Sequence, residues 1–190
     1  VSFAYNQETP VLRRVSFTVE PGRSVAIVGP TGAGKTSILN LLCRFYDPDE
    51  GAILLNGTDL RDLPFATLRS DVAIVLQEAF IFSRPVHENI TLGASISDES
   101  LRRAAEMVQA REFIERLPGG YGEVMAERGA TLSTGQRQLL CFARALAHDP
   151  RVLILDEATS SVDPATEQQI QQAIEILMRG RTSILVAHRL

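Results

Sequence analysis

One eight-residue stretch constrains the fold of this chain more than any other. It runs from Gly29 to Thr36 and fits the phosphate-loop pattern G-x-x-x-x-G-K-[ST] at every position. The apolar run Val25–Val28 precedes it and reads as a buried strand of a parallel sheet, and apolar residues at helical spacing follow from Lys35 to Phe45. A strand, a glycine-rich turn and a helix in this order are the context in which such a loop holds phosphate groups.

Each residue type in this loop serves the binding of phosphate. The glycines let the backbone turn so that successive N–H groups point at the phosphates, and the start of the helix adds unpaired donors and a favourable dipole. Lys35 is expected to place its charge on the β- and γ-phosphates, and Thr36 to offer its hydroxyl to Mg²⁺. The predicted site for ATP comprises Gly29, Pro30, Thr31, Gly32, Ala33, Gly34, Lys35, Thr36 and Ser37.

The rest of the chain alternates between strand and helix patterns. Apolar runs predict buried strands at 72–76, 152–155 and 182–187. Helical patterns run from 133 to about 148 and from 166 to 178. Strands that alternate with helices predict an α/β fold, here a P-loop NTPase core with a mostly parallel sheet.

Two parts of the chain depart from this alternation. Val1–Tyr5 alternates like a strand, and Gly51–Leu55 runs into Asn56-Gly57, a dipeptide typical of tight turns, so we expect an antiparallel N-terminal β part. Between about 84 and 150 the pattern is helical and lacks buried strands, with Ser97 as a candidate N-cap. We therefore expect an inserted helical subdomain at 84–150, between an N-terminal part of the catalytic core at 1–83 and a truncated C-terminal part at 151–190.

Composition excludes several classes of protein. The 190 residues are 45% apolar and 22% charged, which is ordinary for a globular domain, and the net charge of −4 gives no basic excess for nucleic-acid binding. No apolar run approaches the roughly 20 residues that a spanning helix needs, so membrane association must come from a partner or from sequence outside this chain. Cys43 and Cys141 have no metal-ligand spacing, and we expect both to be buried thiols.

A pair of acids, Asp156 and Glu157, ends the apolar run at 152–155. In open α/β sheets, ligands bind outside the carboxyl ends of the strands. Asp156 is therefore predicted to face the Mg²⁺ region, and Glu157 to orient and polarise the attacking water. Taken alone, the pair could equally be two solvated acids that start a turn, and the phosphate loop is what favours the catalytic interpretation.

The segment Leu132–Gln136 is the decisive feature. Its sequence Leu-Ser-Thr-Gly-Gln resembles the LSGGQ signature of the ABC ATPase family, with Thr134 where glycine is usual. The order of the remaining motifs resembles that family along essentially the whole chain. Gln77 follows a strand like the Q-loop glutamine, and Tyr5 lies upstream where the family has an aromatic residue that stacks on adenine. Further matches are Ser160–Asp163 (D-loop) and His188 (switch histidine).

The resemblance implies a mechanism. ABC domains work as head-to-tail dimers, with each ATP between the phosphate loop of one copy and the signature of the other. Ser133 and Gly135 would form a second anion site at a helix N-terminus. In that mechanism the catalytic residues are Glu157, His188, Lys35 and Gln77, and the Mg²⁺ ligands are Thr36, Gln77 and Asp156. Tyr5 stacks on adenine. The residues that contact the partner's nucleotide are Ser133, Thr134, Gly135 and Gln136.

The resemblance also implies partners. One is a second nucleotide-binding domain, in a homodimer or a heterodimer. Another is a transmembrane domain in the same or another chain, which we expect to contact the surface from Gln77 to Arg84, including Phe80 and Phe82. The domain would lie at the cytoplasmic face of a membrane to which the full-length protein is integral.

The sequence disfavours several classes of protein other than an exporter. Glu127–Gly129 and Asp156–Ser160 resemble the multidrug and lipid-flipping exporters, which disfavours an importer motor. The interval from Gln77 to Leu132 is too short for the coiled coil of DNA-repair members, and intact Lys35, Glu157 and His188 disfavour a degenerate site that only scaffolds. A small GTPase is excluded because the sequence lacks an N/T-K-x-D segment.

Overall fold

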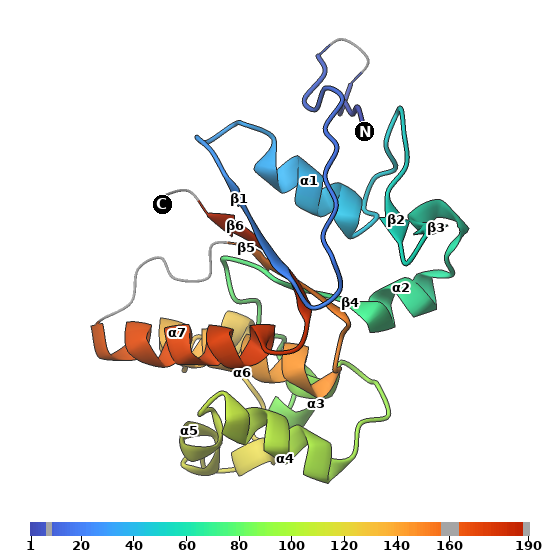
Figure 1. The fold of residues 1–190 in the computed structure, drawn as a ribbon. Coiled ribbons are helices and arrows are strands. Elements are labelled where there is room, and N and C mark those ends of the chain that lie inside the picture. Colours follow the sequence, from blue (N-terminus) through green and yellow to red (C-terminus); the bar gives the residue numbers. More distant parts are fainter. Residues whose placement is uncertain (7–8, 157–163, 188–190) are drawn as a thin grey trace.

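A parallel β-sheet organises the fold in the computed structural model, which describes residues 1–6, 9–156 and 164–187 (Figure 1). Within that part of the chain, its strand order is β1-β6-β5-β4, and each pair of neighbours is parallel. The strands are β1 (Ser24–Val28), β4 (Val72–Val75), β5 (Val152–Asp156) and β6 (Thr182–Ala187). All four strands predicted from apolar runs are confirmed, and the sheet confirms the α/β class.

The register of the sheet brings the predicted site together at one edge. Val28 pairs with Ala187, Asp156 pairs with Val186, and Val75 pairs with Leu155. Because the strands are parallel, their carboxyl ends meet at the same edge, and the phosphate loop begins there directly after β1.

Helices cover both faces of the sheet (Figure 1). Helix α1 (Lys35–Leu42) packs on one face, where Leu39 and Cys43 meet Ile154 and Val186. Helices α6 (Thr134–Ala147) and α7 (Pro164–Met178) cover the other face, toward which Leu153 and Leu155 project. Alternate residues of β5 thus enter different cores, which is why its sequence is a continuous apolar run rather than an alternating one.

A helical layer lies beyond α6, as the sequence predicted (Figure 1). It contains α3 (Val86–Thr91), α4 (Asp98–Met107) and α5 (Arg111–Glu115), with the short 3₁₀ turns η2 (Gly120–Gly122) and η3 (Glu127–Gly129). The predicted cap of α4 is confirmed, because the Ser97 hydroxyl accepts a hydrogen bond from the Ser100 N–H at 3.2 Å. Buried residues of this layer, such as Ile90 and Ile114, belong to the same apolar core as α6.

The N-terminal part is antiparallel but less regular than expected. Strands β2 (Leu54–Leu55) and β3 (Thr58–Asp59) form the predicted hairpin around Asn56-Gly57, whose φ angles of 51° and 82° fit a type I′ turn. The segment 1–5 forms only isolated antiparallel bridges, from Ser2 to Glu50 and from Phe3 to Leu12.

Two details differ from the sequence prediction. Helix α1 ends at Leu42 rather than Phe45, because Cys43 is its C-cap and Arg44 turns the chain with a φ of 52°. The turn η1 (Leu60–Asp62) and helix α2 (Phe65–Asp71) were not predicted, since each is too short to show a helical apolar period.

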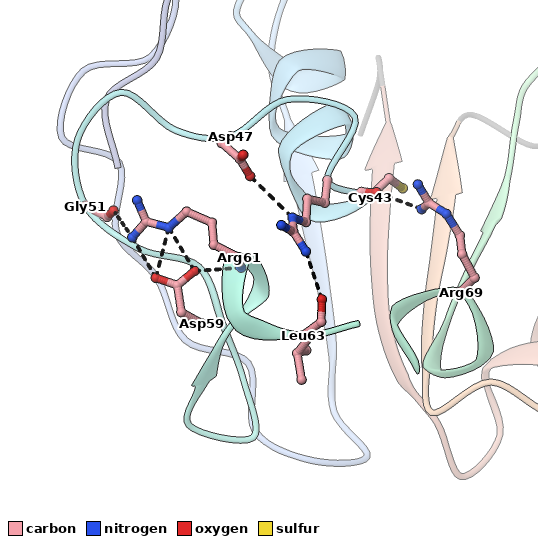
Figure 2. A network of polar contacts seen from close by, with 8 residues as sticks. Cys43, Asp47, Gly51, Asp59, Arg61, Leu63 and Arg69 are labelled. Carbon is pink, nitrogen blue, oxygen red and sulfur yellow. Dashed lines mark hydrogen bonds and ion pairs between the residues drawn. The ribbon is translucent and has the colours of Figure 1, made fainter. Parts of the chain in front are cut away.

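These short elements fasten the C-terminal end of α1 (Figure 2). The Arg69 guanidinium donates to the Cys43 carbonyl at 2.7 Å, so a cation faces the negative end of the helix dipole. Arg44 donates to the Leu63 carbonyl at 2.9 Å and forms an ion pair with Asp47 at 3.5 Å. The helix that begins at the phosphate loop is therefore held at its other end by side-chain contacts.

Both cysteines are buried free thiols, as expected. Burial raises the pKa of Cys43 to about 11, partly offset by Arg69, and burial also raises the pKa of Cys141. Both thiols are therefore protonated at pH 8, where an exposed cysteine is partly thiolate.

We predict that neither reacts with Ellman's reagent at pH 8 in the native protein, and that both react once urea unfolds it. Rapid reaction of either thiol before unfolding would contradict the packing described here.

Candidate functional site

The phosphate loop has a backbone that only glycine allows at key points. Gly32 and Gly34 have φ angles of 83° and 87°, in the left-handed region. A β-carbon at Gly34 would also lie 2.7 Å from the Leu12 side chain, closer than packed atoms approach. Gly34 is the N-cap of α1 and no side chain caps this helix, so its first N–H groups face the loop.

Lys35 brings a positive charge into the loop. Its side chain is only 5% exposed, and its ammonium donates to the carbonyls of Gly29 at 2.7 Å and Pro30 at 2.9 Å. Carbonyl oxygens satisfy hydrogen bonds without neutralising the charge. The ammonium and the start of α1 therefore give the loop a positive potential, which suits a phosphate chain.

The predicted magnesium ligands meet the loop at the same edge of the sheet. Thr36 is the second residue of α1, and Asp156 is the last residue of β5. Gln77 follows the neighbouring strand β4 by two residues and is exposed. Glu157, Ser160–Asp163 and His188 lie outside the described residues. Glu157 and His188 follow directly on Asp156 and Ala187, the last residues of β5 and β6.

Tyr5 is attached to the helix that starts at the phosphate loop. Its hydroxyl accepts a hydrogen bond from the Asn40 side chain of α1 at 2.9 Å. Its ring makes edge contacts with Phe3 at 4.9 Å and Tyr46 at 5.1 Å between ring centroids. The side chain remains 50% exposed, so the ring is positioned by its neighbours and still accessible.

The signature segment begins a helix on the opposite face of the sheet from α1. Ser133 and Gln136 form a capping box: the Ser133 hydroxyl accepts from the Gln136 N–H at 3.2 Å, and the Gln136 side chain accepts from the Ser133 N–H at 2.9 Å. The Thr134 hydroxyl accepts from Arg137 at 3.1 Å, so the residue that replaces the usual glycine is held on the helix surface. The predicted phosphate-loop residues and the signature residues thus lie at the starts of two different helices, α1 and α6.

A family profile identifies this arrangement. Residues 12–160, from before the phosphate loop through the signature to the segment after β5, match the profile described as ABC transporter. This chain belongs to the ABC transporter family. It is an ATP-binding and ATP-hydrolysing domain of that family.

Individual relatives agree with this assignment. An uncharacterised ABC transporter ATP-binding protein of Bacillus subtilis, YfiC, is 50% identical over 100% of this chain and 32% of its own length. An ATP-dependent lipid A-core flippase of Saccharophagus degradans is 45% identical over 100% of the chain and 33% of its length. A solved structure of a bacterial Atm1-family ABC exporter with ATP bound matches with a TM-score of 0.90 and 41% identity, over 100% of this chain and 33% of that one. The chain spans about a third of the length of these relatives.

In this ABC domain, the segment after Gln77 presents two aromatic side chains. Phe80 and Phe82 are 51% and 41% exposed, and their rings meet edge to face at 4.9 Å. Exposed aromatic residues that lie together are typical of contact surfaces.

Two residues that sequence reasoning missed hold this aromatic segment. Asn89 is fully buried, and its side chain accepts from the Phe82 N–H at 2.8 Å and donates to the carbonyls of Phe82 and Arg84, both at 3.0 Å. Arg144 of α6 donates to the Asn89 carbonyl at 2.7 Å and to the Phe80 carbonyl at 3.1 Å. One feature of the sequence indicates a structural role for Asn89, because it is a polar residue beside Ile90 on the apolar face of α3. No such feature of the sequence indicates a role for Arg144.

We predict that Asn89→Ala destabilises the domain. The change leaves the N–H of Phe82 without its acceptor and removes one of the two donors to each of the carbonyls of Phe82 and Arg84, which costs about 1–3 kcal/mol in the free energy of unfolding. Urea denaturation followed by circular dichroism measures this cost. Asn40→Ala is the matched control, because Asn40 makes a single hydrogen bond to the hydroxyl of Tyr5. Equal midpoints for the two variants would show that Asn89 does not hold the segment.

Proposed function

We propose that this domain is the motor of a membrane exporter, and that it hydrolyses Mg-ATP as one half of a head-to-tail pair with a second ABC domain. Two helix N-termini with anion-binding character support this proposal. They belong to α1 and α6, which lie on opposite faces of the sheet. One nucleotide that contacts both kinds of site would therefore bridge this domain and a second ABC domain.

Residues of this chain would hold ATP and its ion as follows. The loop Gly29–Ser37 and Lys35 bind the phosphates, and Tyr5 stacks on the adenine. Thr36, Gln77 and Asp156 offer oxygen atoms, the ligands that Mg²⁺ prefers, so the donor set fits this ion. The described residues contain no cluster of three or more His, Cys, Asp or Glu side chains for a metal, and Mg²⁺ in such sites is held largely by phosphates and water. When bound, Mg²⁺ would neutralise charge on the β- and γ-phosphates.

The remaining roles concern the attacking water and the partner copy. Glu157 would orient and polarise the water, and His188 would contact the γ-phosphate. Ser133, Thr134, Gly135 and Gln136 would contact the nucleotide bound by the partner. The closed dimer is then favoured by ATP and disfavoured after hydrolysis, because the γ-phosphate contacts exist only before it.

A transmembrane partner is proposed at Phe80 and Phe82. The relatives support such a partner, because they include ATP-binding/permease proteins and a flippase. Within the described residues, no helix is both long and apolar enough to cross a bilayer. We propose that the full-length protein is integral to a membrane, with this domain at the cytoplasmic face. Within this domain we propose three parts: an N-terminal part of the catalytic core (1–83), a helical subdomain (84–150) and a C-terminal part of the core (151–190).

We predict that Glu157→Gln binds ATP but hydrolyses it at least about 100-fold more slowly, because the amide cannot polarise the attacking water. Phosphate release under saturating Mg-ATP measures hydrolysis, and binding of a fluorescent ATP analogue measures affinity. Glu167→Gln is the matched control, because Glu167 lies exposed in the first turn of α7. Turnover of Glu157→Gln close to that of the control would show that this carboxylate has another role.

We also predict that a cysteine in place of Phe82 cross-links to the transmembrane part of the full-length transporter. Contact between the two parts brings the introduced thiol within reach of a short bifunctional reagent. Glu175→Cys is the control, because Glu175 is exposed on α7, away from the aromatic segment. Cross-linking at position 175 without any at position 82 would place the partner elsewhere.

A further inference from the structure

Gly135 is glycine because of a neighbouring helix. A β-carbon at this position would lie 2.0 Å from the Thr166 methyl carbon, 3.4 Å from its Cβ and 3.7 Å from its hydroxyl oxygen. Gly135 is the second residue of α6 and does not have a positive φ, so its backbone conformation does not require glycine. A larger residue fits here only if one helix moves by about 1 Å or the stiff Thr166 side chain turns its methyl group away.

This contact joins two parts of the proposed mechanism. On one side is the start of α6, with the signature residues that would serve the partner's nucleotide. On the other side is the first turn of α7, which follows β5 and its terminal Asp156 after a short connection. The contact between Gly135 and Thr166 therefore lies between the helix that carries the signature and the helix that follows the strand of Asp156.

The two helices also pack together further along. Ile170, Ala173 and Leu177 of α7 are buried in the same core as Leu140 and Ala143 of α6. Packed apolar cores resist continuous deformation, so a shift at one helix start displaces the other. The Gly135–Thr166 contact is where such a displacement would reach the signature.

We propose that Thr166 is a positioning residue for the signature half-site, and that its methyl group sets where the start of α6 lies relative to α7. This inference rests on the proposed head-to-tail function. It assigns the need for glycine at position 135 to a contact within the chain, in addition to any contact with the partner's nucleotide.

A pair of compensating substitutions tests this proposal in the full-length transporter. Gly135→Ala introduces the clash and is expected to lower the rate of ATP hydrolysis at least about tenfold. Thr166→Ser removes only the methyl carbon and keeps the hydroxyl, and is expected to lower the rate about twofold to threefold, because the start of α6 loses one packing contact but meets no clash. The double variant regains hydrolysis to within about threefold of wild type, because the atom that clashes is gone. Gly122→Ala is the control, since a β-carbon there meets no atom within 4 Å.

Thermal unfolding of the same variants separates this inference from the proposed function. Gly135→Ala lowers the melting temperature and Thr166→Ser restores it, whether or not the protein hydrolyses ATP. A double variant as inactive as Gly135→Ala, beside an active wild type, would overturn the positioning role while leaving the proposed function intact. An active Gly135→Ala single variant would also overturn it. A wild type that binds but never hydrolyses ATP contradicts the proposed function, and the melting temperatures of the variants then still test the contact between Gly135 and Thr166.

Discussion

The fold depends on how closely the phosphate loop approaches the segment before β1. Gly34 lies against Leu12 with no room for a β-carbon, and its left-handed backbone directs the chain from β1 into α1. Lys35, the next residue, is thereby buried with its ammonium on the loop carbonyls. Arg69 and Arg44 hold the far end of α1, so the helix start keeps its place at the edge of the sheet. The proposed Mg²⁺ ligands Asp156 and Gln77 lie at or just after the ends of β5 and β4, at the same edge of the sheet.

Helix α6 connects the signature segment with the exposed aromatic segment that contains Phe80 and Phe82. Its first turn carries the signature, capped by Ser133 and packed against Thr166. Near its C-terminal end, Arg144 binds the carbonyls of Phe80 and Asn89 and so holds the exposed aromatic segment. The aromatic segment and the signature are therefore connected through one helix of 14 residues. The same helix thus links a proposed membrane contact to a proposed nucleotide contact.

Much of this architecture follows from local sequence patterns. The buried strands, the Ser97 cap, the start of a helix at position 133 and the Asn56-Gly57 turn depend on short-range chemistry, and each lies where its pattern predicted. Helix α2 was missed because seven residues carry too little periodicity. Asn89, Arg144 and Thr166 were missed because their importance arises from contacts between elements far apart in the chain. The proposed roles of Glu157 and His188 rest on sequence, since both lie outside the described residues.

In the proposed function, ATP binds between two ABC domains, and a pair of identical copies of this domain is one form of that site. Sedimentation velocity of the Glu157→Gln protein, with and without Mg-ATP, tests it most directly, because slow hydrolysis preserves the γ-phosphate contacts. We expect a monomer without nucleotide and a dimer with Mg-ATP, and we expect Mg-ADP to leave the monomer unchanged. A protein that binds Mg-ATP tightly and stays monomeric at every concentration tested would contradict a composite site built from two identical copies.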